Sequence, residues 1–146
     1  MKNYNDYLEN IGISNDSLKN KISEIISYFN KFYSNEDLRD IFVSDYIDQD
    51  GNRNYTSLWL IYEDRICEAK NFINEVDIDS TYYTKNQVVY WNLKSKLGIK
   101  DDFNDSDRLS LNVTFNKEAL RGEFKAAKNN CTYLMYILKE YFVTRN

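Results

Sequence analysis

Acidic side chains and one cysteine are the residues whose types and spacing bear most directly on chemistry. Four aspartates gather in a short segment beside Asn104: Asp101, Asp102, Asp105 and Asp107. Clustered carboxylate oxygens suit hard cations such as Mg²⁺ or Ca²⁺, but a solvated surface loop accounts for the same run, and we expect the loop. Glu75, Asp77 and Asp79 alternate along an extended segment. We interpret them as an exposed strand edge whose charge discourages unwanted pairing, rather than as a weak cation site.

Histidine is missing from the chain, and its absence narrows the available chemistry. Histidine is the usual proton carrier at neutral pH and the commonest metal ligand, so Ser-His and Cys-His nucleophile pairs are excluded. Cys131 lies in the first turn of the last expected helix, where the helix dipole and Lys128 favour a thiolate. It also begins the apolar stripe of that helix, and a buried cysteine is inert. We expect Cys131 to pack in the core, and we expect no catalytic residue, no metal and no cofactor.

The segment 48–52, Asp-Gln-Asp-Gly-Asn, resembles part of a calcium-binding loop. Aligning Gly51 with the turn glycine of an EF-hand places Tyr46 and Ser57 at positions that require Asp and Glu, so the pattern fails. The Asp50-Gly51 pair is instead typical of a hairpin turn.

Aromatic residues are numerous enough that some should lie on the surface, where they anchor protein interfaces. Most of them are expected in the core, including some of the group Trp59, Trp91, Tyr62, Tyr82, Tyr83 and Tyr90. The residues we expect to form an exposed binding surface are Tyr62, Tyr82, Tyr83 and Tyr90. Stacking of nucleic-acid bases is the weaker alternative, because basic neighbours are missing.

Composition bounds the class of protein. The 146 residues are 42% hydrophobic and 16% aromatic, which excludes disorder and suits one domain with its own core. The net charge of −4 comes without a basic stripe, so we expect no binding to nucleic acid or to anionic membranes. No stretch approaches the roughly 20 apolar residues that span a bilayer, and residues 1–6 show no signal-peptide pattern. Two distant cysteines make no disulfide framework, so we expect a cytoplasmic location.

Helices are expected at both ends of the chain. Apolar residues at spacings of three and four predict a helix over 16–33, with cap oxygens available from Ser14, Asn15 and Asp16. A short second helix is expected over 34–41, and a last helix over 130–143, capped by Asn129 or Asn130. Residues 1–10 are expected to contribute little to stability.

Between the helices the pattern predicts antiparallel strands with short connections. Leu109, Leu111, Val113 and Phe115 alternate with polar residues, which indicates one buried face and one wet face. Thr56 to Tyr62 is apolar on both faces, as in a central strand. The other expected strands cover 42–47, 65–72, 76–83, 87–93 and 123–127. We find no βαβ alternation, so a doubly wound sheet is not expected.

From about Thr56 to its end, the chain resembles a bacterial pleckstrin-homology-like or GRAM-like domain. The resemblance covers about ninety residues and depends on the run Leu58 to Ile66, on 109–115, on 124–126 and on the final helix. It implies a strongly bent antiparallel barrel closed at one end by the C-terminal helix. Lipid-binding members carry several basic residues near the first hairpin loops, whereas this turn is Glu63-Asp64 with Arg65 alone. Inositol phosphate binding is therefore not expected.

These observations predict an α+β domain covering 1–146, with a helical segment over 1–40. An antiparallel sheet or barrel of about six to seven strands follows over 41–128, and a capping helix over 129–146. We expect a non-enzymatic binding or adaptor module that recognises a protein or peptide, and a homo-oligomer is compatible with it. Two alternatives stay open: a small enzyme using carboxylates and tyrosines in a cleft of the sheet, and an accessory factor of a bacterial or phage system.

Overall fold

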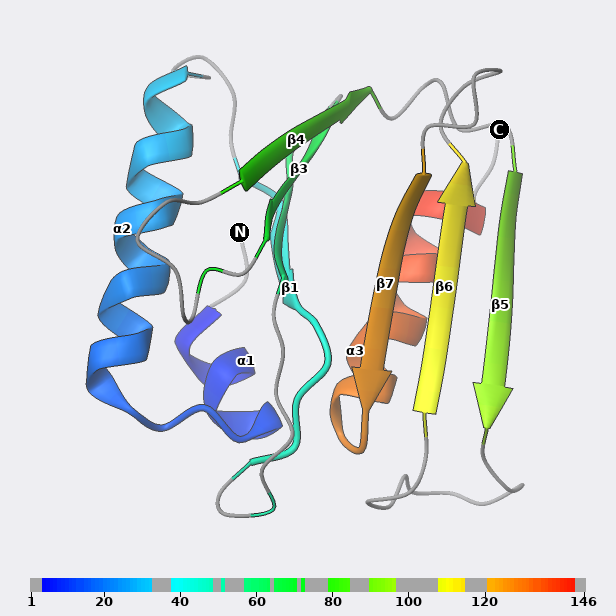
Figure 1. Ribbon diagram of the computed structural model, residues 1–146, viewed down its shortest axis with the longest axis horizontal. Helices are drawn as coiled ribbons and strands as arrows, with labels where there is room; N and C mark the ends of the chain where they lie inside the picture. The colour runs from blue at the N-terminus through cyan, green and yellow to red at the C-terminus, as the bar shows by residue number, and fades with distance from the viewer. Residues whose placement is uncertain are drawn as a thin grey trace.

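The computed structural model (Figure 1) describes residues 4–32, 38–48, 51, 57–63, 65–70, 72, 79–84, 90–96, 108–114 and 121–143. Two helices come first, α1 (Tyr4–Ile11) and α2 (Asp16–Phe32). The strands that follow are β1 (Asp40–Val43), β2 (Ser57–Ile61), β3 (Arg65–Lys70), β4 (Asp79–Thr84), β5 (Tyr90–Lys96), β6 (Arg108–Thr114) and β7 (Arg121–Ala127). The last helix is α3 (Asn130–Ile137), which continues as the π-helix η2 (Leu138–Val143).

The strands form two antiparallel sheets, so the expected α+β class is confirmed, and the expected single sheet or barrel of six to seven strands is wrong. One sheet has the order β1-β2-β3-β4 and the other the order β5-β6-β7. Each strand pairs with its neighbour in the chain, but within the described residues the ladder breaks between β4 and β5. In the described residues the two sheets are joined by side-chain packing and by one short parallel bridge, in which the Ala127 amide of β7 donates to Asp45 O just after β1.

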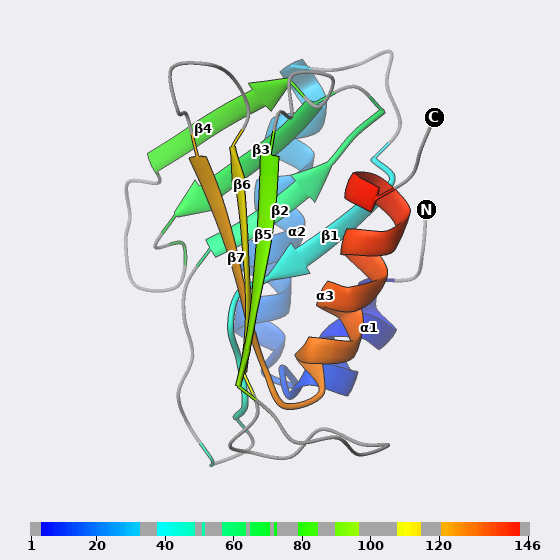
Figure 2. The same ribbon diagram turned by 90° about the vertical axis from the view of Figure 1, so that its right-hand side faces the viewer.

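The four-stranded sheet is covered on both faces. Figure 1 shows α2 along one face and the second sheet on the other side, and Figure 2 shows α3 beside the second sheet. Side chains alternate between the two faces of a strand. Phe42 and Trp59 are cross-strand partners and share the face toward β7, while Leu58 and Leu60 occupy the opposite face. This double cover explains why β2 is buried over Leu58–Ile61, as its sequence predicted.

Phe124 of β7 lies at the centre of the core between the two sheets. Its ring stacks on Trp59 with centroids 4.0 Å apart, and it also contacts the rings of Phe42 and Phe142. These four rings come from β7, β2, β1 and η2. Aromatic packing thus connects both sheets to the end of the chain.

Strand β6 shows the expected alternation of buried and wetter residues. Leu109, Leu111 and Val113 are buried, and the polar residues between them are partly exposed. Asn15 also fulfils its expected role, because its Oδ1 accepts a hydrogen bond of 3.0 Å from the Leu18 amide at the start of α2.

The sequence predicted a helical segment over 1–40 but no distinct helix at its start, where α1 lies. Helix α1 ends in a Schellman motif, in which the Ile13 amide donates to Leu8 O at 2.8 Å and the Gly12 amide to Glu9 O at 3.1 Å. Gly12 has a φ of 109°, and a Cβ at this position would meet Ile47 O at 2.5 Å. Both the backbone conformation and the lack of space therefore require glycine. The missed signal was this glycine after an amphipathic segment.

Two further expectations around β1 are wrong. The short helix expected over 34–41 does not reach Leu38 or Asp40, because the Arg39 amide already donates to Ile61 O and β1 begins at Asp40. Residues 33–37 lie outside the described part. The strand expected over 42–47 ends at Val43, and Tyr46 then adopts a φ of 91°, which is incompatible with an extended strand.

The expected last helix over 130–143 is an α-helix up to Ile137 and a π-helix beyond it, and it lacks the expected cap. Asn129 occupies the N-cap position without a side-chain cap bond. The side-chain amides of Asn129 and Asn130 instead donate to backbone carbonyl groups of other segments. None of the helices in the described residues combines the length and apolar character needed to cross a membrane.

Candidate functional site

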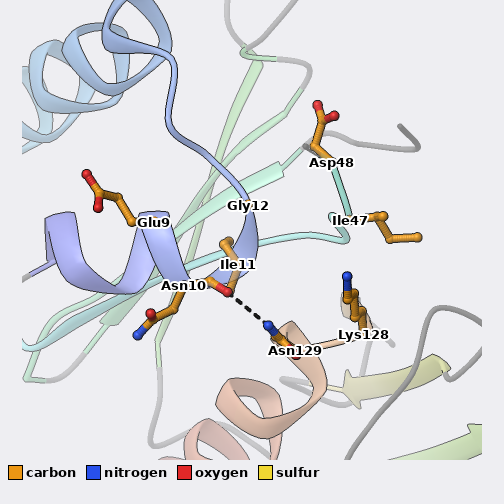
Figure 3. Close-up of a pocket in the computed structure, with 8 residues that line it drawn as sticks. All are labelled: Glu9, Asn10, Ile11, Gly12, Ile47, Asp48, Lys128 and Asn129. Atoms are coloured by element: carbon orange, nitrogen blue, oxygen red, sulfur yellow. Dashed lines mark hydrogen bonds between the residues drawn. The ribbon is translucent and has the colours of Figure 1, made fainter. Parts of the chain in front are cut away.

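A small recess lies where the end of α1, the segment after β1 and the start of α3 converge (Figure 3). Its volume is about 130 Å³, and the residues that line it are Glu9, Asn10, Ile11, Gly12, Ile47, Asp48, Lys128 and Asn129. Asn129 Nδ2 donates to Asn10 O at 3.2 Å across one side of the recess. Glu9 pairs with Lys19 of α2, their charged atoms being 2.5 Å apart. The recess therefore combines charges of both signs with backbone groups.

A buried polar network connects α1, the end of β1 with the segment after it, and the start of α3. The Tyr7 hydroxyl donates to Asn130 Oδ1 and accepts from the Val43 amide, both at 2.9 Å. Asn130 Nδ2 donates to Val43 O at 2.6 Å and to Asp45 O at 3.0 Å. These bonds satisfy backbone groups that leave the β1 ladder at Val43. They fasten α1, β1 with the segment after it, and the start of α3 to one another, which is a structural role.

A carboxylate–tyrosine pair with a direct hydrogen bond lies elsewhere in the described residues. Tyr141 of η2 donates to Asp40 Oδ2 of β1 at 2.6 Å, and Asp40 is buried. Burial, followed by the adjacent Asp40 carboxylate, raises the pKa of Tyr141 above its ordinary value. Neither residue lines the recess. Their hydrogen bond joins η2 to β1 of the four-stranded sheet.

The outer edge of β5 is the second candidate site. β5 pairs with β6, and no other described strand adds to its far side. Trp91 and Leu93 lie opposite the buried residues Val113 and Leu111, so they share the core-facing side of this sheet. Trp91 is nevertheless 37% exposed and Leu93 is partly exposed, because α3 packs against β6 and β7. Trp91 and Leu93 thus form an apolar margin of the sheet that reaches the surface at β5.

The expected aromatic binding surface is corrected at one position. Tyr62 is fully buried, and its hydroxyl donates to Asn30 Oδ1 of α2 at 2.5 Å, so it is no surface anchor. Tyr82 and Tyr83 belong to β4 and Tyr90 to β5, but their side chains lie outside the described part. The exposed aromatic residues that the structure does describe are Tyr28 and Trp91, at 55% and 37%.

The other chemical candidates are placed only in part. Cys131 is buried, and its thiol donates to Ala126 O at 3.6 Å, which confirms the expected core position. The acidic run 101–107 and the residues Glu75 and Asp77 lie outside the described part, as does most of the 48–52 turn. Within the described residues, no group of three or more Cys, Asp or Glu side chains is placed to hold a metal ion.

Comparison with known proteins assigns no relative. No family model, no curated protein and no solved structure matches this chain. Any assignment of function therefore depends on the geometry of the recess and of the β5 edge.

Proposed function

We propose that this protein is a non-enzymatic binding module, and that the outer edge of β5 contacts a protein or peptide partner. The observation that carries the proposal is Trp91, which lies on the core-facing side of an edge strand yet is 37% exposed. Tryptophan is among the residues most enriched where interfaces derive their binding energy. Its position at a strand edge suits an extended partner.

The backbone of β5 supports this mode of binding. An edge strand presents a row of amide and carbonyl groups to which a further strand can add. Lys94 and Ser95 are exposed along the same strand, so its surface is accessible over several residues. Main-chain hydrogen bonds would supply affinity, and Trp91 with Leu93 would select apolar side chains on one face of the partner.

The recess supports a binding module better than an enzyme. Its volume of about 130 Å³ is below the roughly 300–1,000 Å³ of ordinary small-molecule sites. Glu9 is already paired with Lys19, and the buried network of Tyr7 and Asn130 consists of groups that hydrogen-bond to one another. A recess of this size suits one small polar group of a partner rather than a drug-sized substrate.

The resemblance to a pleckstrin-homology-like domain stays a prediction. Antiparallel strands followed by a terminal helix packed on β6 and β7 support it. The division of the strands into two sheets differs from the single bent barrel that the resemblance implies. The proposed binding function depends on the β5 edge and not on this resemblance, because a fold does not by itself specify a function.

Affinity capture with matched variants tests the proposal. The tagged protein and its Trp91→Ser and Tyr28→Ser variants would be incubated with lysate of the native host, and captured proteins quantified by mass spectrometry. Tyr28 is the control because it is an exposed aromatic residue on α2, away from β5. We expect a partner that is retained by the wild type and by Tyr28→Ser and is lost with Trp91→Ser. Equal capture by all three proteins would contradict a site at β5.

A further inference from the structure

We infer that the strand added at this edge is β5 of a second copy of the chain, so that the two three-stranded sheets join into one sheet across a two-fold axis at Leu93. The inference rests on the proposed function, because both use the outer edge of β5, and it names the partner. Two-fold dimers are the commonest symmetric assemblies, and their interfaces use the same patch twice. A single edge strand can supply such a patch.

The sequence of β5 is self-complementary about Leu93. The strand has seven residues, Tyr-Trp-Asn-Leu-Lys-Ser-Lys, with Leu93 in the middle. Antiparallel pairing about Leu93 places Asn92 opposite Lys94 of the second copy and Trp91 opposite its Ser95. Lys96 then lies opposite Tyr90. Both lysines therefore have uncharged residues directly across the interface.

Other registers of the same strand are less favourable. Moving the two-fold axis by one residue, to Lys94, places the two Lys94 side chains directly opposite each other. Moving it to Ser95 places Lys94 opposite Lys96, and moving it to Asn92 opposes no lysines but pairs only five of the seven residues of β5. Like charges in directly opposed cross-strand positions are destabilising. The register about Leu93 is thus the one that pairs all seven residues and also avoids opposed lysines.

The same register covers the apolar margin of the sheet. Trp91, Leu93 and Ser95 share the core-facing side of β5, and residues directly opposite each other lie on the same face of a sheet. The indole of each Trp91 would therefore lie against Ser95 and Leu93 of the second copy. The pairing accounts for an exposed tryptophan on the side of the strand that otherwise faces the core.

Introducing a charge at position 92 provides the test. Within one chain, Asn92 lies opposite Asn112 and Lys94 opposite Ser110, so neither has a charged residue directly across the strand. In the dimer, Asn92→Lys would create two opposed lysine pairs, and Asn92→Glu two opposed Glu–Lys pairs. The double variant Asn92→Lys with Lys94→Glu restores opposite charges. Asn112→Lys is the matched control, because it adds the same charge on the same face of the central strand.

Sedimentation equilibrium of the full chain would measure the mass and the dissociation constant. We expect a species of twice the 17.5 kDa chain mass that dissociates on dilution. Two cross-strand charge pairs should shift the dissociation constant by roughly two- to thirtyfold, upward for Asn92→Lys and downward for Asn92→Glu. The dissociation constant of the double variant should return toward the wild-type value. That of Asn112→Lys should equal the wild-type value. Recovery in the double variant would show that Asn92→Lys had not simply misfolded.

Two results would overturn the inference. One is a monomer at the highest soluble concentration, which is the outcome expected if the edge lysines serve to prevent strand pairing. The other is a dimer whose dissociation constant is the same in wild type and Asn92→Lys. A monomer that still captures a host protein through Trp91 would overturn self-pairing and leave the proposed function standing. A dimer that follows the charge at position 92 without any captured protein would support self-pairing and contradict a different partner.

Discussion

Tyr7 is the residue through which α1 is hydrogen-bonded to the buried network. Its hydroxyl joins the Val43 amide to Asn130 Oδ1, and its ring contacts Tyr133 with centroids 4.6 Å apart. Burial is the main cause that raises the pKa of Tyr7 far above its ordinary value. The hydroxyl therefore stays protonated in the folded protein and continues to donate to Asn130.

Replacing Tyr7 with phenylalanine tests this role at two pH values. At neutral pH, Tyr7→Phe leaves two buried partners unsatisfied and should lower the free energy of unfolding by about 1–3 kcal/mol or more. The exposed control Tyr28→Phe should change it by less than about 0.5 kcal/mol. Urea denaturation measures both values.

The pH dependence has a definite sign. Above about pH 10 an unfolded tyrosine loses its proton, whereas folded Tyr7 keeps it because its pKa is raised. The unfolded state then binds fewer protons, so stability falls as pH increases. The advantage of the wild type over Tyr7→Phe should shrink by up to about 1.4 kcal/mol per pH unit above that point. Parallel stability curves for the two proteins would show that Tyr7 ionises equally well in both states.

At the scale of elements, β6 offers adjacent residues with opposite environments. Leu111 is fully buried, whereas Asn112 lies on the wetter face. Leu111→Ala should lower the free energy of unfolding by about 2–5 kcal/mol through lost burial and the cavity that remains. Asn112→Ala should cost less than about 1 kcal/mol. Equal losses in urea denaturation would contradict the register of β6.

Helix α1 should matter more than the sequence suggested. Removal of residues 1–10 was expected to change little, but Tyr7 and Leu8 are buried in the core. Truncation before Ile11 should therefore abolish a cooperative thermal transition, and Leu8→Ala should cost about 2–5 kcal/mol. Asn20→Ala, at an exposed position on α2, is the matched surface control. A truncated chain that melts as cooperatively as the full one would mean that α1 is dispensable.

At the scale of the whole molecule, one side chain connects regions far apart in sequence. Asn130 bonds to Tyr7, Val43 and Asp45, which precede it by 123, 87 and 85 residues. It therefore fastens α3 to α1 and to the segment after β1, where the chain leaves the first sheet. The Ala127 amide adds to this junction by donating to Asp45 O at 3.0 Å.

Adjacent asparagines test this junction. Asn130→Ala leaves several buried polar groups unsatisfied and should lower the free energy of unfolding by at least about 2 kcal/mol. Asn129 is exposed, and its one described side-chain bond reaches Asn10 O, so Asn129→Ala should cost less than about 1 kcal/mol. Thermal and urea unfolding of both variants would measure the difference. Similar losses of unfolding free energy in the two variants would show that the buried hydrogen bonds of Asn130 contribute no more stability than the exposed bond of Asn129.

Local patterns in the sequence predicted the helices and strands whose buried face can be identified from the spacing of their own apolar residues. The stripe of α2, the alternation of β6 and the double-sided apolar run of β2 each predicted the right element, because neighbouring residues dictate which face is buried. Cys131 was placed correctly for the same reason. The candidate site was not predictable in this way, because exposure at a sheet edge depends on which strands lie beside it.

Only the tertiary structure decided the features that depend on distant partners. Helix α1 carries just a few apolar residues, and its place in the core comes from contacts with Asn130 and Tyr133 near the other end of the chain. Tyr62 is buried because α2 supplies Asn30 as its hydrogen-bond partner. Trp91 is exposed because β5 lies at the edge of its sheet and α3 packs against β6 and β7. Periodicity specifies which side of an element is apolar, but the packing of separate segments specifies whether that side is covered.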